Sequence, residues 1–205
     1  FLSRVQFRDA EHVDGQLNLD NVEKLILKSK VHKPIIKTVS IENTHLASGG
    51  SIVSFDSIKS LSKIVRKHDL KLHIDGARIW HAIQEDKNMN YGHYCDSLTF
   101  CFSKALGAPI GSMLLGSEEF IREAREFRKK LGGGMRQVGV VASMARTALQ
   151  SRESILEDHA KAKKVYDCLI ANLNNEKIES IVYKGTNMIF LNIKNDEDPN
   201  KLLNI

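Results

Sequence analysis

The sequence predicts an α/β fold: a mostly parallel sheet flanked by helices, followed by the start of a small α+β C-terminal domain. Two observations carry this prediction. Short apolar, β-branched stretches alternate with longer amphipathic stretches of helical period over most of the chain, a pattern typical of strand–helix–strand repeats. After about residue 173 the alternation stops, and two short apolar stretches follow one another. We therefore expect residues 1–150 to form part of a large domain, and residues 151–205 a linking helix and the beginning of a smaller, truncated domain.

The first half of the chain contains two predicted helices and two predicted strands. Each helix has apolar residues at helical spacing behind a capping residue, Asp20 in the first and Ser54 in the second. Each strand is a short run of apolar and β-branched residues. The helices are expected at 21–30 and 54–68, and the strands at 35–42 and 71–74.

The second half continues the alternation before the pattern changes. Strands are expected at 97–102, 110–115, 178–182 and 188–193, and helices at 117–130, 138–151, 153–173 and from 196 onward. Gly116 ends one of these strands, and the glycine run 132–134 separates two of the helices. Because sheets of this kind bind ligands at the carboxyl ends of their strands, polar residues just after a strand are the first candidates for a site.

Composition argues against several classes of protein. The 205 residues are 42% hydrophobic and 27% charged, which is ordinary for a globular protein. The net charge is +5, but acids and bases are interleaved, as in 118–130, so we expect no nucleic-acid partner. No apolar run is long enough for a membrane span. The three cysteines, an odd number without metal-ligand spacing, predict reduced thiols in the cytoplasm and no metal site.

Two segments carry the strongest chemical signal. Residues 72–78 (LHIDGAR) place Asp75 at the end of a predicted strand, and residues 103–109 (SKALGAP) place Lys104 after the next one. An enzyme that holds pyridoxal phosphate needs this pair, a lysine for the Schiff base and a carboxylate that keeps the pyridinium nitrogen protonated. Each segment also has a plainer interpretation. Asp-Gly commonly forms a turn or caps a helix, and a lysine beside glycine is commonly solvated.

With these residues in view, the chain resembles the low-specificity L-threonine aldolases, which are fold-type I pyridoxal-phosphate enzymes of the aminotransferase-like superfamily. Each matching motif is weak alone, but their order along the chain is specific. The motifs are IENTH at 41–45, HIDGAR at 73–78, CDS at 95–97, SKALGAPIGS at 103–112, GGGMRQ at 132–137 and TNM at 186–188.

The resemblance assigns roles to the residues around Asp75 and Lys104. Lys104 would form the Schiff base, and Asp75 would pair with the ring nitrogen. Arg78, one helical turn after Asp75, would lie near the phenolic oxygen of the cofactor and the substrate carboxylate, which suits a planar guanidinium. Ser103 would bind the cofactor phosphate. A solvated arginine at a helix end is the alternative for Arg78.

Two further features are implied with alternatives left open. His45, just after a predicted strand, would accept the proton of the substrate β-hydroxyl, although a bound water or a purely structural histidine competes with this role. The glycine run 132–134 with Lys129 and Arg136 would reach the cofactor phosphate of a neighbouring subunit, which implies a homo-oligomer, a tetramer built as a dimer of dimers. A flexible hinge is the alternative.

The resemblance implies cleavage of L-threonine or L-allo-threonine to glycine and acetaldehyde, a carbon–carbon lyase reaction that forms glycine. The chain lacks the family's upstream phosphate loop, the histidine that stacks on the cofactor and the downstream arginine for the substrate carboxylate. We therefore expect this chain alone to bind the cofactor weakly or not at all. The alternatives are a related pyridoxal-phosphate lyase or hydroxymethyltransferase, and a non-catalytic remnant of the fold.

Overall fold

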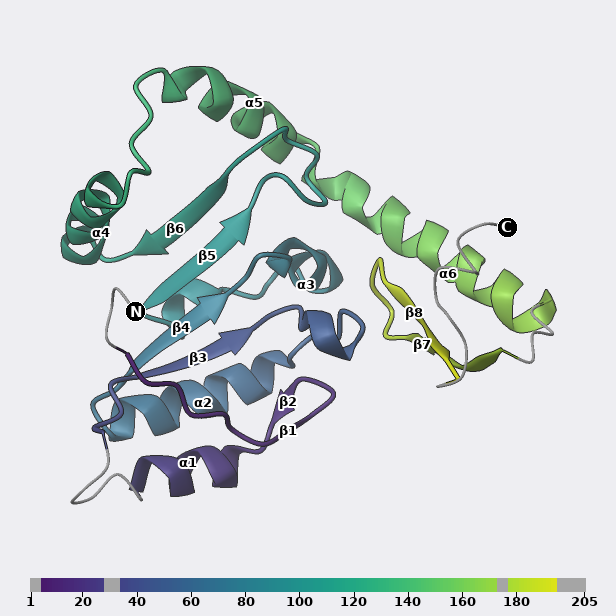
Figure 1. The fold of residues 1–205 in the computed structure, drawn as a ribbon, viewed down its shortest axis with the longest axis horizontal. Helices are drawn as coiled ribbons and strands as arrows, with labels where there is room; N and C mark the ends of the chain where they lie inside the picture. The colour runs from purple at the N-terminus through teal and green to yellow at the C-terminus, as the bar shows by residue number, and fades with distance from the viewer. Residues whose placement is uncertain (1–4, 28–33, 173–176, 195–205) are drawn as a thin grey trace.

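A four-stranded sheet lies at the centre of the computed structural model, which describes residues 5–27, 34–172 and 177–194 (Figure 1). In spatial order its strands are β3 (Thr38–Glu42), β4 (Lys71–Asp75), β5 (Ser97–Cys101) and β6 (Ser112–Gly116). The first three are parallel to one another, and β6 is antiparallel to β5. The mostly parallel sheet flanked by helices is therefore confirmed.

The register of the sheet aligns the ends of the three parallel strands. Glu42, the last residue of β3, pairs with Asp75, the last residue of β4. Asp75 in turn pairs with Thr99, two residues before the end of β5. Because parallel strands run in one direction, the loops that follow them emerge at one edge of the sheet. This common edge receives the segments that begin at Asn43, Gly76 and Phe102.

Helix α2 (Phe55–Lys67) covers part of the sheet and carries the clearest local signals. Ser54 caps the helix, with the Ser57 amide donating to its hydroxyl at 3.1 Å. Ile58, Leu61 and Val65 form its buried stripe and belong to the core that also contains residues of β4. Helix α1 (Leu19–Leu27) lies beside α2, as Figure 1 shows. The expected start of α2 at Ser54 is thus confirmed.

The second half of the chain is more open. Helices α4 (Glu118–Lys130), α5 (Val138–Gln150) and α6 (Ile155–Asn172) follow β6. In Figure 1, α4 lies by the end of β6, α5 lies on the outer side of β6, and α6 extends away from the sheet. Within the described residues α4 has no buried side chain, and α5 buries only Ala145. Strands β7 (Ile178–Tyr183) and β8 (Ile189–Ile193) form an antiparallel hairpin beside α6. None of the helices in the described ranges is long and apolar enough to cross a membrane.

Several predicted boundaries are wrong, for local reasons. Helix α1 begins at Leu19, and its cap is Asn18, whose side chain accepts from the Asn21 amide at 3.0 Å; Asp20 lies inside the first turn. Strand β3 begins at Thr38 instead of residue 35, and β6 spans 112–116 because Gly111 has a φ of 125°. Helix α6 begins at Ile155 instead of residue 153. The predicted ends at 28–30 and at 173, and the helix from 196, lie outside the described residues.

The sequence prediction also missed short elements. Helix α3 (Ile79–Glu85) has seven residues and no side-chain cap at Arg78, which leaves little local signal. The hairpin of β1 (His12–Val13) and β2 (Gln16–Leu17) has two residues in each strand. Three single-turn 3₁₀ helices complete the described elements, at Leu46–Ser48, Tyr91–His93 and Arg152–Ser154.

Replacing Gly76 by alanine is expected to destabilise the sheet edge. A Cβ atom at this position would lie 2.6 Å from the Thr99 carbonyl oxygen and 2.9 Å from Ile79 Cβ. Overpacking of this kind costs about 1–3 kcal/mol, which chemical denaturation would measure. Gly139→Ala is the matched control. Its Cβ meets nothing within 4 Å, so its free energy of unfolding should stay unchanged or rise by less than about 1 kcal/mol. Equal stability of the two variants would contradict the close packing at Gly76.

Candidate active site

Three polar side chains follow the three parallel strands at one edge of the sheet. Asp75 is the last residue of β4, His45 lies three residues after β3, and Lys104 lies three residues after β5. The placement of Asp75 and Lys104 at the ends of adjacent parallel strands is as predicted. A carboxylate, an amine and an imidazole thus come from separate loops that share one edge.

The Asp75 carboxylate has one oxygen engaged within the protein. Its Oδ1 accepts from the Ala77 amide at 3.1 Å and from the Thr99 hydroxyl at 3.3 Å. The turn interpretation of Asp-Gly is therefore correct for this oxygen. Among the described residues both hydrogen bonds end on Oδ1, which leaves Oδ2 for a donor from outside. A protonated ring nitrogen is such a donor.

Arg78 reaches the same edge by a turn rather than by a helical repeat. The expectation that Asp75 and Arg78 lie one helical turn apart is wrong, because Asp75 is in a strand and α3 begins only at Ile79. The chain between them turns tightly, with the Ile79 amide bonded to the Gly76 carbonyl at 2.9 Å. Arg78 is half-buried as the residue that precedes α3. Its charge is close enough to His81 to contribute to lowering the pKa of that histidine, after burial and His159.

Lys104 and Ser103 are exposed at the tip of a turn with a packed base. The Gly107 amide donates to the Lys104 carbonyl at 2.8 Å, and the Ala108 amide to the Phe102 carbonyl at 3.0 Å. Phe102 and Ala108 are buried, whereas Ser103 and Lys104 are exposed. The described residues therefore hold the lysine backbone firmly but do not desolvate its amine.

His45 is held between two loops. Its ring Nδ1 lies 2.8 Å from the Ser48 hydroxyl, and its amide donates to the Ser51 carbonyl at 2.8 Å. The His12 ring packs edge-on against it with centroids 5.0 Å apart. A Cβ on Gly15 would lie 2.6 Å from His45 Cβ, so the β1–β2 hairpin lies directly against this side chain. Sequence reasoning missed His12, because nothing in its local sequence indicates that contact.

Asn43 supports the loop that carries His45. It is fully buried, and its Oδ1 accepts from the Val53 amide at 3.1 Å. Its Nδ2 donates to the Tyr91 hydroxyl at 3.4 Å, which itself donates to Met89 Sδ at 3.1 Å. Burial raises the pKa of Tyr91 to about 12, partly offset by the Asn43 hydrogen bond, so Tyr91 keeps its proton at neutral pH. The loop is thus connected to the core by hydrogen bonds between buried groups.

The β7–β8 hairpin packs on the same loop from the far end of the sequence. The Thr186 hydroxyl donates to the Gly50 carbonyl at 3.0 Å, and Thr186 is fully buried. Lys184 forms an ion pair with Asp14 of the β1–β2 turn at 2.6 Å. Segments 170 positions apart therefore meet beside His45.

Other predicted residues lie away from this edge. β6 ends beside the start of β5, because Gly116 pairs with Ser97, so α4 begins at the opposite edge of the sheet. Lys129 and Arg136 are both exposed near and beyond the end of α4. The structure of one chain does not bring these two cations to Asp75.

His73, two residues before Asp75, lies within β4. Burial lowers the pKa of His73, and Asp75 opposes this effect. Its Nδ1 is 2.8 Å from the Ser97 hydroxyl.

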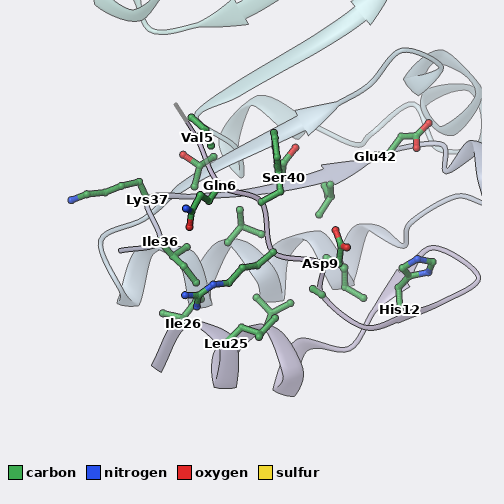
Figure 2. Close-up of a pocket in the computed structure, with 18 of the residues that line it drawn as sticks. Val5, Gln6, Asp9, His12, Leu25, Ile26, Ile36, Lys37, Ser40 and Glu42 are labelled. Atoms are coloured by element: carbon green, nitrogen blue, oxygen red, sulfur yellow. The ribbon is translucent and has the colours of Figure 1, made fainter. Parts of the chain in front are cut away.

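One cavity lies apart from the Asp75–Lys104 edge. Its volume is about 970 Å³, and it extends between the N-terminal segment, α1 and the outer side of β3. Figure 2 shows Leu25, Ile26 and Ile36 along it and His12 toward one end. His45 lines this cavity, but neither Asp75 nor Lys104 does. We therefore do not assign the candidate cofactor site to it.

The residues at the strand ends fit pyridoxal phosphate in part. Asp75 offers an open carboxylate oxygen for the ring nitrogen, and Lys104 offers an accessible amine for the aldehyde. Arg78 directly precedes α3 at the same edge, and the exposed Ser103 neighbours Lys104 in the chain. The donor set thus suits a flat ring with a protonated nitrogen, an aldehyde and an anionic group. Among the described groups of His, Cys, Asp and Glu, no cluster of three is arranged to hold a metal ion.

Asn43→Ala is expected to lower the free energy of unfolding by about 1–3 kcal/mol, because it leaves the buried Val53 amide without an acceptor. Tyr91→Phe is the matched control, since it removes only the hydroxyl end of the same network and should cost less. Denaturation of both variants would measure the difference. A Tyr91→Phe variant less stable than Asn43→Ala would contradict the central role of the asparagine.

Comparison with known proteins adds independent findings. The sequence model described as beta-eliminating lyase matches residues 1–194. The low-specificity L-threonine aldolase of Candida albicans is 40% identical over 179 residues, covering 85% of this chain and 46% of that protein. The Escherichia coli K12 low specificity L-threonine aldolase is 36% identical over 188 residues, covering 88% and 53%. The chain thus spans about half the length of the curated relatives it matches.

Solved structures agree on the fold. The crystal structure of a proposed L-allo-threonine aldolase from Listeria monocytogenes has a TM-score of 0.77 and 19% identity, and the match covers 93% of this chain and 51% of that one. At this identity the similarity shows the fold alone, which is that of the fold-type I enzymes. Because the family model covers nearly the whole sequence, the chain belongs to the beta-eliminating lyase family.

Proposed function

We propose that the protein cleaves L-threonine, and L-allo-threonine, to glycine and acetaldehyde with pyridoxal phosphate as its cofactor. The observation that carries this proposal is the placement of Asp75 and Lys104 at the ends of adjacent parallel strands. The relatives named low-specificity L-threonine aldolase support the substrate class, at 36–40% identity over most of this chain. The reaction is a carbon–carbon lyase reaction that breaks the Cα–Cβ bond and forms glycine.

Each site residue has a defined task in this reaction. Pyridoxal phosphate, when bound, supplies an aldehyde that captures the amino group and a ring that accepts the electron pair of the broken bond. Lys104 would hold the cofactor through its amine. Asp75, through its open Oδ2, would accept a hydrogen bond from the protonated ring nitrogen and so keep that nitrogen charged. Arg78 binds the substrate carboxylate, and Ser103 the cofactor phosphate.

His45 accepts the proton that leaves the substrate β-hydroxyl as the Cα–Cβ bond breaks. The Ser48 hydroxyl lies 2.8 Å from His45 Nδ1 and fixes the ring; in the tautomer in which Nδ1 donates to this hydroxyl, Nε2 is the acceptor. The same position is open to a water held by the ring, which would then accept the proton instead.

We further propose a homo-oligomer, a dimer of dimers, that works in the cytoplasm. Lys129 and Arg136 are exposed and distant from the strand ends of their own chain, which supports a contribution to the cofactor phosphate of a neighbouring subunit. The exposed apolar side chains of α4 and of the segment that follows it, Phe127, Leu131 and Met135, support burial of this surface in an assembly. The three free cysteines support a reducing compartment.

Lys104→Ala should abolish cofactor capture in the full-length protein. We expect the long-wavelength absorbance band of the bound cofactor, which borohydride removes, to be present in the wild type and missing in the variant. Acetaldehyde release from threonine should fall by about 10³-fold or more. Lys63→Ala, which changes an exposed lysine of α2, is the control and should behave as the wild type. An unchanged band in Lys104→Ala would overturn the cofactor assignment. A normal band with cleavage only of other amino acids would overturn the substrate assignment.

His45→Asn should lower kcat by about 10²–10⁴-fold, the usual loss on removing a general base. The asparagine amide can still contact Ser48, so the loop is expected to remain folded. The cofactor band should therefore persist. His93→Asn, at an exposed position in a 3₁₀ turn, is the control. A loss of kcat below about tenfold would show that the base is another group, such as the bound water.

A further inference from the structure

Three side chains outside the candidate site form a chain of hydrogen bonds between α3 and α6. His159 Nδ1 lies 2.8 Å from Glu85 Oε1, and His159 Nε2 lies 2.8 Å from His81 Nδ1. The two imidazole rings stack with centroids 5.0 Å apart and planes 21° from parallel. His81 is 1% exposed, and His159 is 7% exposed. Neither histidine is used by the proposed reaction.

The positions of the protons follow from the chemistry of the groups. A carboxylate only accepts, so His159 Nδ1 donates to Glu85. In a neutral pair His159 Nε2 is then an acceptor, and His81 Nδ1 must donate to it. One added proton can be shared without loss of a hydrogen bond, since either ring can carry it. A second added proton places N–H groups on both facing nitrogens, and the contact between His81 and His159 is then lost.

The charges around the pair oppose that second proton. Burial, the His159 cation and Arg78 lower the pKa of His81 to about 4, against a smaller opposing effect of Asp158. Glu85 faces the pair from α3, and Tyr183 faces it from β7. Burial also raises the pKa of Tyr183, so that hydroxyl stays protonated. The hydrogen bond between His81 and His159 is therefore kept at neutral pH and is lost only in acid.

His159 lies where three elements that support the site meet. Its side chain contacts α3, which begins directly after Arg78. Its carbonyl oxygen accepts from the Tyr183 hydroxyl of β7 at 3.4 Å. The β7–β8 turn in turn packs on the His45 loop through Thr186. A change at His159 is thus connected to the Asp75–Arg78 turn and to the His45 loop.

We propose that Glu85, His159 and His81 form a proton-sensitive joint that positions the Asp75–Arg78 turn and the β7–β8 hairpin and that opens on acidification. The three residues are positioning residues, because none lies among the strand-end groups assigned to cofactor or substrate. The joint itself is independent of the proposed function. Only its effect on catalysis rests on that function.

The sign of the pH effect follows from the direction of the His81 shift. Because the folded-state pKa lies below the ordinary 6.5, the unfolded chain binds the proton first. Stability therefore falls as the pH drops from about 6.5 toward about 4. Below both values the folded and unfolded states carry the same proton, and this contribution no longer changes.

The test is a histidine and amide NMR titration of the protein, with His81→Asn beside the wild type. The asparagine Nδ2 lies near the position of His81 Nδ1 and donates to His159 without titrating. In the wild type we expect one of the two facing nitrogens, His81 Nδ1 or His159 Nε2, to carry a proton at pH 7 and to donate it to the other. The amides of Ile79 and Thr186 should shift with the His81 ring on acidification, and this component should be missing in His81→Asn. His93→Asn should retain it. All other ionisable groups are common to both proteins, so the difference between the two isolates His81.

Two results would overturn the proposal that Glu85, His159 and His81 form this joint. One is a wild-type protein in which neither His81 Nδ1 nor His159 Nε2 carries a proton at pH 7, because the contact between the two rings then lacks a donor. This measurement needs no variant and remains informative if His81→Asn fails to fold. The other is the same acid-dependent amide shifts, and the same fall of thermal stability between pH 6.5 and pH 4, in the wild type and in His81→Asn.

Discussion

The parallel register of β3, β4 and β5 is the constraint on which the candidate site depends. It places Glu42, Asp75 and Thr99 side by side. The register continues past the strands, since the Asn43 amide donates to the Asp75 carbonyl and the Gly76 amide to the Thr99 carbonyl. A shift of one strand by one residue would turn its side chains to the other face of the sheet. For β4, such a shift would move the Asp75 side chain to the opposite face of the sheet.

The site separates the groups that react from the groups that hold them. Asp75 and Lys104 are exposed, whereas Asn43, Thr186 and the apolar base of the Lys104 turn are buried. Buried hydrogen bonds are the ones that fix geometry, because an unmade bond there is costly and water cannot replace it. The open groups keep their ordinary solvation, which a bound ring and further protein would remove. The framework that carries the lysine is therefore buried and preformed, whereas the lysine itself is exposed.

The sequence predicted what local chemistry determines. The strands β4 and β5, the cap at Ser54 and the placement of Asp75 and Lys104 all follow from apolar runs and capping residues within a few positions. Helix α3 was missed because it is short and has no side-chain cap. His12 and His159 were missed for a different reason. Their partners are distant in sequence, 78 positions away for His159, and only the tertiary fold brings them together.

The surface of α4 and α5 links the oligomer proposal to the site. Phe127, Leu131, Met135 and Val140, which follow one another closely in the sequence, are 53–64% exposed, and large apolar side chains in water favour burial by a partner. Lys129 and Arg136 lie among them. A partner that covered the apolar residues would therefore also enclose two cations, which is unfavourable unless an anion neutralises them. A cofactor phosphate at the strand ends of that partner is such an anion, so covering this surface and completing the site are explained by one contact.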